Sequence, residues 1–186
     1  MKKLLGILVS VLFLSTNTTM GAEEVKFDIV YKTEIYEIRK YSERLVAQAI
    51  NDKDNTTFRK LFNYIAGANN SSKKIAMTTP VLQMKKNNVP FMQFYIPSKF
   101  NKKTTPIPIN SDVEILLMKE GYFAIIRFSG RSSDKNFIKY SKILHEKLLE
   151  DKILISGFAI KATYNPPWTL PPFRRNEVMF NIKWES

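Results

Sequence analysis

The stretch KIAMTTPV, residues 74–81, is the most informative part of the sequence because it combines strand-forming residues with a proline that interrupts them. Ala76 is small enough to let a helix pack closely on the strand, and Met77 has a flexible apolar side chain that adapts to irregular neighbours or ligands. Pro80 lacks a backbone N–H, so it indicates a bulge or a sheet edge, where binding clefts often form. The stretch therefore predicts either a bulged strand that only packs on a helix or a strand beside a cleft.

The residues on both sides of this stretch predict a unit of two strands, a helix and two more strands. Residues 29–41 and 44–50 are rich in β-branched and aromatic side chains, so we expect two strands before the helix. Residues 74–84 and 91–96 have the same character and complete the unit. Together these elements make the first half of the domain, about residues 26–97.

The helix of this unit is predicted by apolar side chains that recur at i, i+3, i+4 and i+7, the spacing of one helix face. These residues are Phe58, Leu61, Phe62 and Ile65. Residues 55–57 supply capping Asn and Thr side chains before the stripe, and Gly67 ends the helix because glycine tolerates a positive φ. The stripe either packs wholly into the core or offers part of its surface to a ligand.

A second half, about residues 111–185, repeats this order of elements. Residues 113–118 and 122–128 predict two strands, and residues 157–164 and 178–184 predict the closing pair. Between them lies a capped helix with its own apolar stripe, formed by Phe137, Tyr140, Leu144 and Leu148.

The arrangement of these elements predicts the fold class. The last strand alternates apolar residues from Val178 to Trp184 with a second set that includes Glu177 and Met179, the pattern of a strand buried on one face. Residues 97–110 contain three prolines and link the halves without regular structure. A duplicated strand-strand-helix-strand-strand unit predicts an α+β fold, a distorted antiparallel β-barrel with two helices packed outside. We expect residues 23–186 to form this single domain of two pseudo-symmetric halves.

Three motifs resemble signatures of the SOUL haem-binding protein family. IAMTTPV at residues 75–81 resembles the I-A-M-T-x-P-V signature, YNPP at 164–167 the Y-[ND]-P-P signature, and RRNEV at 174–178 the R-R-N-E-V signature. The motifs occur in the family's order, and the resemblance covers about residues 26–185. It implies a small barrel-like α+β domain that binds tetrapyrroles through a mainly apolar surface.

The resemblance places the tetrapyrrole surface along the first helix, near the IAMT strand and the tyrosine of the second motif. Carried onto this sequence, it implies haem contacts from Phe58, Leu61, Phe62, Ile65, Met77 and Tyr164. Haem would be held non-covalently by apolar contacts and nearby Lys and Arg, with its axial ligand unassigned. The single histidine, His145, lies on the flank of the second helix and is not expected to ligate the iron. We expect no catalytic residue and no metal-binding side chain.

Two features near the C-terminus each leave two interpretations open. Residues 164–173 contain four prolines together with Trp168 and Phe173, a stiff loop that either plugs one end of the sheet, as we expect, or covers a cleft. Glu177 follows two arginines and either fixes the end of this loop through an ion pair or contacts a ligand. The bacterial gyrase-inhibitor-like domains, which the predicted fold resembles, use a carboxylate in their cleft to attract cationic ligands.

Residues 1–22 have the pattern of a secretory signal peptide. Lys2 and Lys3 are followed by an apolar run at residues 4–14, then by small and polar residues up to Ala22. Because the run is shorter than the about 20 residues that span a bilayer, we expect cleavage near Ala22 and a periplasmic or secreted protein. An uncleaved N-terminal anchor is the alternative.

The composition limits the kinds of site that the chain can build. It has no cysteine and one histidine, which excludes disulfides, thiolate chemistry and metal sites made of several His or Cys ligands. Its formal net charge of +12 predicts a soluble surface that attracts anionic ligands or anionic lipid to some degree. No nucleic-acid-binding motif accompanies this charge.

These observations favour an exported, non-catalytic protein that binds or carries haem or another tetrapyrrole. The alternative is a binding domain for a different apolar or cationic small molecule, with incidental affinity for haem. A haem-modifying enzyme is a weaker third interpretation, because no proximal ligand is evident.

Overall fold

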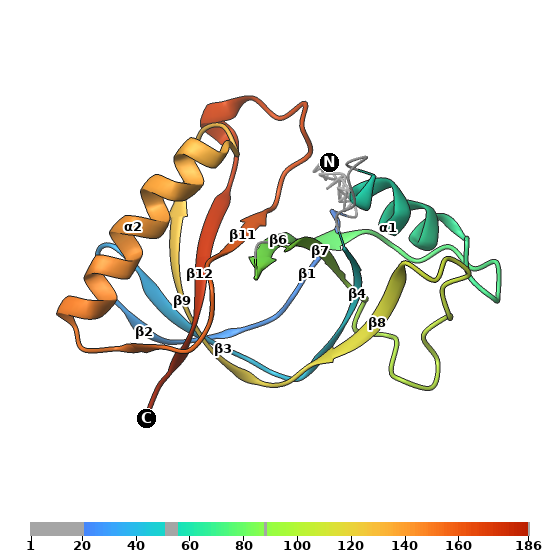
Figure 1. Cartoon of the computed structure of the whole chain (residues 1–186), viewed down its shortest axis with the longest axis horizontal. Coiled ribbons are helices and arrows are strands. Elements are labelled where there is room, and N and C mark those ends of the chain that lie inside the picture. Colours follow the sequence, from blue (N-terminus) through green and yellow to red (C-terminus); the bar gives the residue numbers. More distant parts are fainter. Residues whose placement is uncertain (1–20, 51–55, 88, 186) are drawn as a thin grey trace, which may run out of the picture.

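A computed structural model describes residues 21–50, 56–87 and 89–185. Within them the chain forms a curled antiparallel sheet flanked by two helices, an α+β fold as predicted (Figure 1). Most of the expected signal peptide, residues 1–20, and the expected capping residue Asn55 lie outside the described residues.

Within the described residues, each half contains one α-helix with strands before and after it, but the first half has seven strands and the second five. The first half contains β1 (Glu23–Glu24), β2 (Asp28–Lys32), β3 (Glu37–Tyr41), β4 (Arg44–Ile50), α1 (Thr57–Ala66), β5 (Thr78–Thr79), β6 (Val81–Lys86) and β7 (Val89–Tyr95). The second contains β8 (Val113–Met118), β9 (Gly121–Phe128), α2 (Asp134–Glu150), β10 (Leu154–Ile155), β11 (Ile160–Thr163), the 3₁₀ helix η1 (Pro171–Phe173) and β12 (Asn176–Lys183).

The strands of the two halves interleave in one sheet. Its order is β2-β3-β9-β12-β11-β6-β7-β4-β8, with β10 added beside β12, and all its pairings are antiparallel. The end strands β2 and β8 do not pair with each other, so the predicted barrel is a curled half-barrel. Pairs such as β3–β9, β4–β8 and β6–β11 join the halves. The duplication of one ancestral unit stays a prediction.

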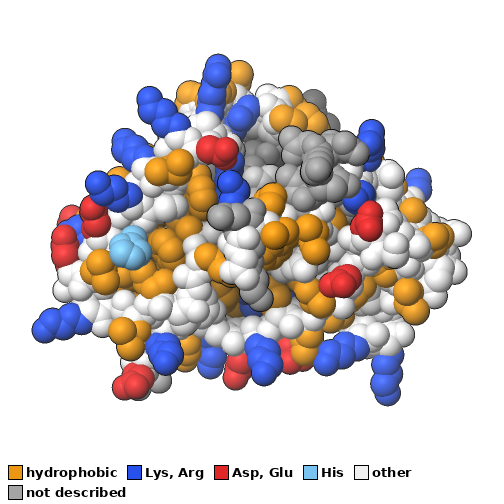
Figure 2. Space-filling view, in the orientation of Figure 1, with side chains coloured by type: hydrophobic (Ala, Val, Ile, Leu, Met, Phe, Trp, Pro, Cys, Tyr) orange, Lys and Arg blue, Asp and Glu red, His pale blue; other side chains and the backbone are white. Residues whose placement is uncertain are grey.

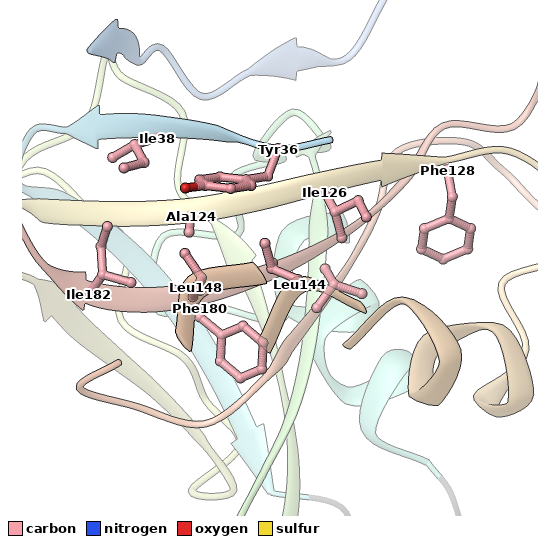
Figure 3. Packing of buried hydrophobic residues seen from close by; sticks show 10 residues of the cluster. Tyr36, Ile38, Ala124, Ile126, Phe128, Leu144, Leu148, Phe180 and Ile182 are labelled. Carbon is pink, nitrogen blue, oxygen red and sulfur yellow. The ribbon is translucent and has the colours of Figure 1, made fainter. Parts of the chain in front are cut away.

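Three clusters of buried apolar side chains hold the fold together. α2 covers the first against β9 and β12, where Leu144 and Leu148 are fully buried (Figure 3). α1 covers the second against β4 and β7. Successive strand residues point to opposite faces, so Ala124 joins the α2 cluster while Ile125 joins the third. This third cluster lies on the face opposite the helices, which the curl of the sheet turns inward; we call it the concave face.

Two strand predictions are wrong in detail. Residues 29–41 form a hairpin of β2 and β3, because the Thr33 hydroxyl accepts hydrogen bonds from the N–H groups of Ile35 and Tyr36 and turns the chain. β12 is buried on both faces, with Glu177 and Met179 0% and 1% exposed. Its central position in a curled sheet places one face under α2 and the other in the concave cluster.

The strand predicted at residues 74–84 begins later, at Thr78, and is interrupted at Pro80 as the sequence predicts. β5 pairs with β1 in a short parallel ladder, and the chain enters β6 after the cis Thr79–Pro80 bond. Gly67 ends α1 with a φ of 124°, a conformation that only glycine adopts easily. Residues 97–110 contain no helix or strand, as predicted, apart from a single bridge between Asn69 and Pro108.

Candidate functional site

The outer face of α1 carries a pair of exposed aromatic rings. Phe58 and Phe62 are 48% and 49% exposed, and their rings stack with 6.1 Å between centroids and 14° between planes. Their i, i+4 spacing places both on one side of the helix. Phe58 also contacts the buried Phe94 ring of β7 at 5.3 Å, which fixes the pair on the sheet. The two rings form a small flat apolar surface in contact with solvent.

The six residues predicted to contact haem do not form one surface. Leu61 and Ile65 are buried between α1 and the sheet, and Met77 packs at the margin of the same cluster. Tyr164 packs in the concave cluster, on the other face of the sheet. Of the predicted haem contacts on α1, the stacked pair of Phe58 and Phe62 is therefore the part that is exposed.

Basic side chains lie around α1. Arg59 is exposed three residues before Phe62, and Lys73 and Lys74 are exposed beyond the C-terminal end of the helix. The N–H of Ile75 donates to the Ile65 carbonyl at 2.8 Å, which keeps these two lysines beside the helix. Their charges can attract the anionic groups of a ligand that lies on the aromatic pair.

Glu177 is the centre of a buried ionic network on the concave face. Its carboxylate accepts two hydrogen bonds from the Arg39 guanidinium, both at 2.9 Å. It also accepts one from Arg175 Nε at 2.9 Å and one from the Tyr164 hydroxyl at 2.7 Å. Two parallel bonds from one guanidinium to one carboxylate are the strongest arrangement of such a pair. The network joins β3, β12 and the start of the proline-rich loop.

The protonation of this network follows from its contacts. Burial alone would raise the pKa of the Glu177 carboxyl, but the hydrogen bonds and charge of Arg39, with Tyr164 and Arg175, hold it below its usual value. Burial and the neighbouring carboxylate raise the pKa of the Tyr164 hydroxyl, which stays neutral. Glu177 is fully buried and both its oxygens accept hydrogen bonds. It therefore forms the ion pair with Arg175 that fixes the end of the loop, the first of the two interpretations, and it pairs with Arg39 as well.

The concave face also holds an open cleft of about 570 Å³. Its lining includes Phe91, Leu116, Met118, Phe123, Phe158 and Gln93, and no charged side chain of the described residues takes part. Gln93 is 6% exposed; its amide nitrogen donates to Gln48 at 2.8 Å, whereas its oxygen is buried without a partner. A cleft of this size and composition suits an uncharged, mainly apolar molecule. The sequence does not indicate this cleft, because its walls come from strands far apart in the chain.

The single histidine lies away from the aromatic pair. His145 is exposed on α2, and its ring contacts Phe180 at 6.1 Å between centroids. Figure 2 shows it over α2, bordered by apolar side chains. Among residues 21–50, 56–87 and 89–185, no cluster of three or more His, Cys, Asp or Glu side chains is arranged to hold a metal ion. No helix in these same ranges has the length and apolar character to cross a membrane.

The proline-rich loop does not plug the sheet. Trp168, Leu170 and Phe173 are 82%, 64% and 75% exposed. Arg174 donates to the carbonyls of Thr169 and Pro167, which folds the loop on itself and leaves its large side chains outside. The expectation that the loop plugs one end of the sheet is wrong, because the loop forms these hydrogen bonds within itself and its large side chains point away from the sheet.

Comparison with known proteins identifies relatives of the chain. The sequence model of the SOUL heme-binding protein family matches residues 22–181. Heme-binding protein 2 from Homo sapiens is 32% identical over 162 residues, which cover 77% of this chain and 76% of the human protein. Heme-binding protein 1 from Xenopus laevis is 26% identical over 129 residues, 65% of this chain and 66% of that protein.

Solved structures share the fold at much lower identity. The C-terminal domain of EcmrR superposes with a TM-score of 0.59 at 11% identity, over 84% of this chain and all of that domain. An uncharacterized conserved protein from Listeria innocua superposes with a TM-score of 0.60 at 9% identity, over 82% of this chain and 94% of that one. These likenesses support the curled α+β architecture alone.

Proposed function

Because the chain belongs to the SOUL heme-binding protein family, we propose that it binds haem or a related tetrapyrrole non-covalently and carries it without catalysing a reaction. The observation that supports this most directly is the stacked pair of exposed rings, Phe58 and Phe62, on α1. A porphyrin is a flat aromatic system, so it is stabilised by stacking on such rings and by removing their apolar surface from water.

The remaining residues of the proposed site act around this pair. Leu61 and Ile65 anchor α1 on the sheet and hold the rings in place, while Met77 offers an adaptable apolar side chain at the edge of the same cluster. Arg59, Lys73 and Lys74 supply positive charge for the two propionates. Tyr164 acts indirectly, because its hydroxyl is committed to Glu177 on the concave face.

Absorbance titration with haem tests this proposal. Phe62→Asp removes one ring and places a charge against the porphyrin, so it should weaken binding about tenfold or more. His145→Ala should leave both the affinity and the Soret spectrum unchanged, since His145 does not ligate the iron in this proposal. The matched control is Ile138→Asp, which puts the same charge at a 66% exposed position on α2. Circular dichroism checks that each variant is folded.

The opposite ranking would overturn the site assignment. If His145→Ala changes the spin state of the iron and Phe62→Asp does not weaken binding, an axial histidine holds the haem and the α1 surface does not. A broad, non-saturating titration of the wild-type protein would instead indicate adsorption to apolar surface.

A second candidate function is supported by the concave cleft. Its apolar, uncharged lining favours a neutral, mainly apolar small molecule. A cationic ligand is disfavoured, because no described carboxylate lines the cleft and the Glu177 carboxylate is paired with two arginines. Leu116→Trp would narrow the cleft and leave α1 intact. Loss of haem binding in this variant, with Phe62→Asp unaffected, would move the haem site from α1 to the cleft.

We further propose that the protein is exported after cleavage near Ala22. The charged and apolar pattern of residues 1–22 supports this, and Glu23 is the first residue of a described strand, so cleavage there spares the fold. Mass spectrometry of the periplasmic or secreted protein from an export-competent host measures the terminus. Recovery there with Met1 intact would contradict cleavage.

A further inference from the structure

The loop between β11 and β12 exposes large apolar side chains that take no part in the core. Trp168, Leu170 and Phe173 lie within six residues of each other and are 82%, 64% and 75% exposed. An exposed cluster of large apolar side chains usually marks an interaction site. From this geometry we propose that the loop, residues 165–173, docks the protein on the surface of an anionic lipid bilayer. The proposal does not depend on haem binding.

The loop is held in one conformation before it meets a partner. The N–H of Thr169 donates to Pro166 at 3.1 Å and that of Phe173 to Leu170 at 3.0 Å. Arg174 Nε donates to the Thr169 carbonyl at 2.7 Å. The Gly130 N–H donates to Pro171 at 2.8 Å and ties the loop to the segment before α2. A preformed loop loses little conformational entropy when it binds.

The backbone of the loop suits the boundary between lipid and water. An N–H group that enters lipid without a partner is costly, but the four prolines of residues 166–172 have none. Thr169 and Phe173 have theirs bonded within the loop, whereas those of Trp168 and Leu170 have no partner among the described residues and would meet the polar headgroups. Tryptophan combines a large apolar ring with one polar N–H and is therefore favoured at the lipid headgroup level.

Positive charge around the loop indicates an anionic surface. Arg131 and Lys135 are exposed on the segment that begins α2, which the Gly130–Pro171 hydrogen bond places against η1. The exposed Asp134 between them pairs with Lys161 at 3.3 Å, so the net charge of this segment stays positive. Figure 2 shows Lys and Arg side chains gathered with apolar ones at the top of the molecule, over this region. Basic residues near an anionic bilayer each contribute about 1 kcal/mol of attraction. The same charges repel a second copy of the chain that approaches by this face.

Vesicle binding with a built-in reporter tests the proposal. The chain has two tryptophans, so in a Trp184→Phe background Trp168 is the sole emitter. Its emission should shift to shorter wavelength on phosphatidylcholine vesicles that contain phosphatidylglycerol, and lipids brominated on their chains should quench it. Replacing Trp168, Leu170 and Phe173 together by serine in the wild-type chain should lower co-sedimentation with these vesicles about tenfold or more. All variants share one N-terminus, so any contribution from residues 4–14 is constant.

Two further variants separate the apolar from the electrostatic contribution. Ile107→Ser with Ile109→Ser removes side chains of similar exposure, 64% and 71%, from the linker between the halves and should change nothing. Arg131→Gln with Lys135→Gln should weaken binding to the anionic vesicles about fivefold per charge and leave the weak binding to pure phosphatidylcholine unchanged. Equal binding of the serine variant and the wild type, or an unshifted Trp168 spectrum, would overturn the proposal. A shift that needs no lipid and grows with protein concentration would assign the loop to self-association instead.

Discussion

Replacing Glu177 by glutamine removes one negative charge from the interior without changing the size of the side chain. The wild-type carboxylate is 0% exposed and accepts hydrogen bonds from Arg39, Arg175 and Tyr164. In the variant, the Arg39 guanidinium, whose side chain is 4% exposed, keeps its charge and loses its buried partner. The amide of the new glutamine also places N–H donors against N–H donors.

The expected cost is large for a domain of this size. Removing one partner of a buried ion pair typically costs about 3–5 kcal/mol, because the remaining charge stays buried without compensation. Glu37 still pairs with Arg39 at 2.6 Å and offsets part of that charge. We therefore expect Glu177→Gln to lower the free energy of unfolding by about 3 kcal/mol, a large part of the about 5–15 kcal/mol of a typical domain.

Urea denaturation at several pH values measures this cost and its origin. The folded-state pKa of Glu177 is below its unfolded value, so its charge stabilises the wild type fully above the unfolded pKa. That contribution is lost as the pH falls through the lower, folded pKa. The difference between wild type and Glu177→Gln should therefore be constant near neutral pH and shrink in the acid range, below about pH 4.5.

A matched control uses the same substitution on the surface. Glu146 pairs with Lys142 at 3.8 Å and its side chain is 54% exposed, so Glu146→Gln should change the free energy of unfolding by less than about 0.5 kcal/mol. A cost below about 1 kcal/mol for Glu177→Gln, or a difference that grows in acid, would refute the claim that this charge network holds β3 and β12 together.

Three further outcomes follow from other contacts. Tyr64→Phe should destabilise the fold by about 1 kcal/mol in urea denaturation, because the buried Pro106 carbonyl loses the hydroxyl that donates to it at 2.8 Å; an unchanged midpoint would contradict this. Ser133→Ala should cost about 1 kcal/mol and lower the melting temperature, since the Ser133 side chain accepts the N–H of Asn136 at the start of α2. Residues 23–104 expressed alone should show no cooperative melting by circular dichroism, because β3, β4 and β6 lose their partners β9, β8 and β11; a cooperative transition would show that the half folds by itself.

Elements that depend on local pattern were predictable from the sequence. The i, i+4 spacing of Phe58 and Phe62 and the stripe ending in Leu148 follow from the 3.6-residue turn of a helix, so both helices were predicted close to their observed bounds. The hairpin at residues 29–41 was missed because one hydroxyl, that of Thr33, makes its turn, while the strand-forming side chains continue through it.

Features that depend on long-range pairing were not predictable in the same way. Arg39 and Glu177 are 138 positions apart, and nothing in the local pattern of either strand indicates a partner. Glu177 and Met179 were expected on the exposed face, because the alternation of apolar and polar residues along β12 indicates one buried face. The same alternation contains no sign that the sheet curls and buries its second face. The candidate site could be predicted only in part for the same reason. The helical stripe identified the apolar residues of α1, but it did not indicate which of them the sheet would cover.

The position of β12 in the sheet has a consequence for when the chain can fold. This strand is the last in sequence, yet it lies between β9 and β11 and carries Glu177 into the centre of the concave face. During synthesis, every other strand emerges from the ribosome before the one that joins the two sides of the sheet. The β9–β12 and β11–β12 pairings and the buried network around Glu177 therefore form only after the other described strands have been made.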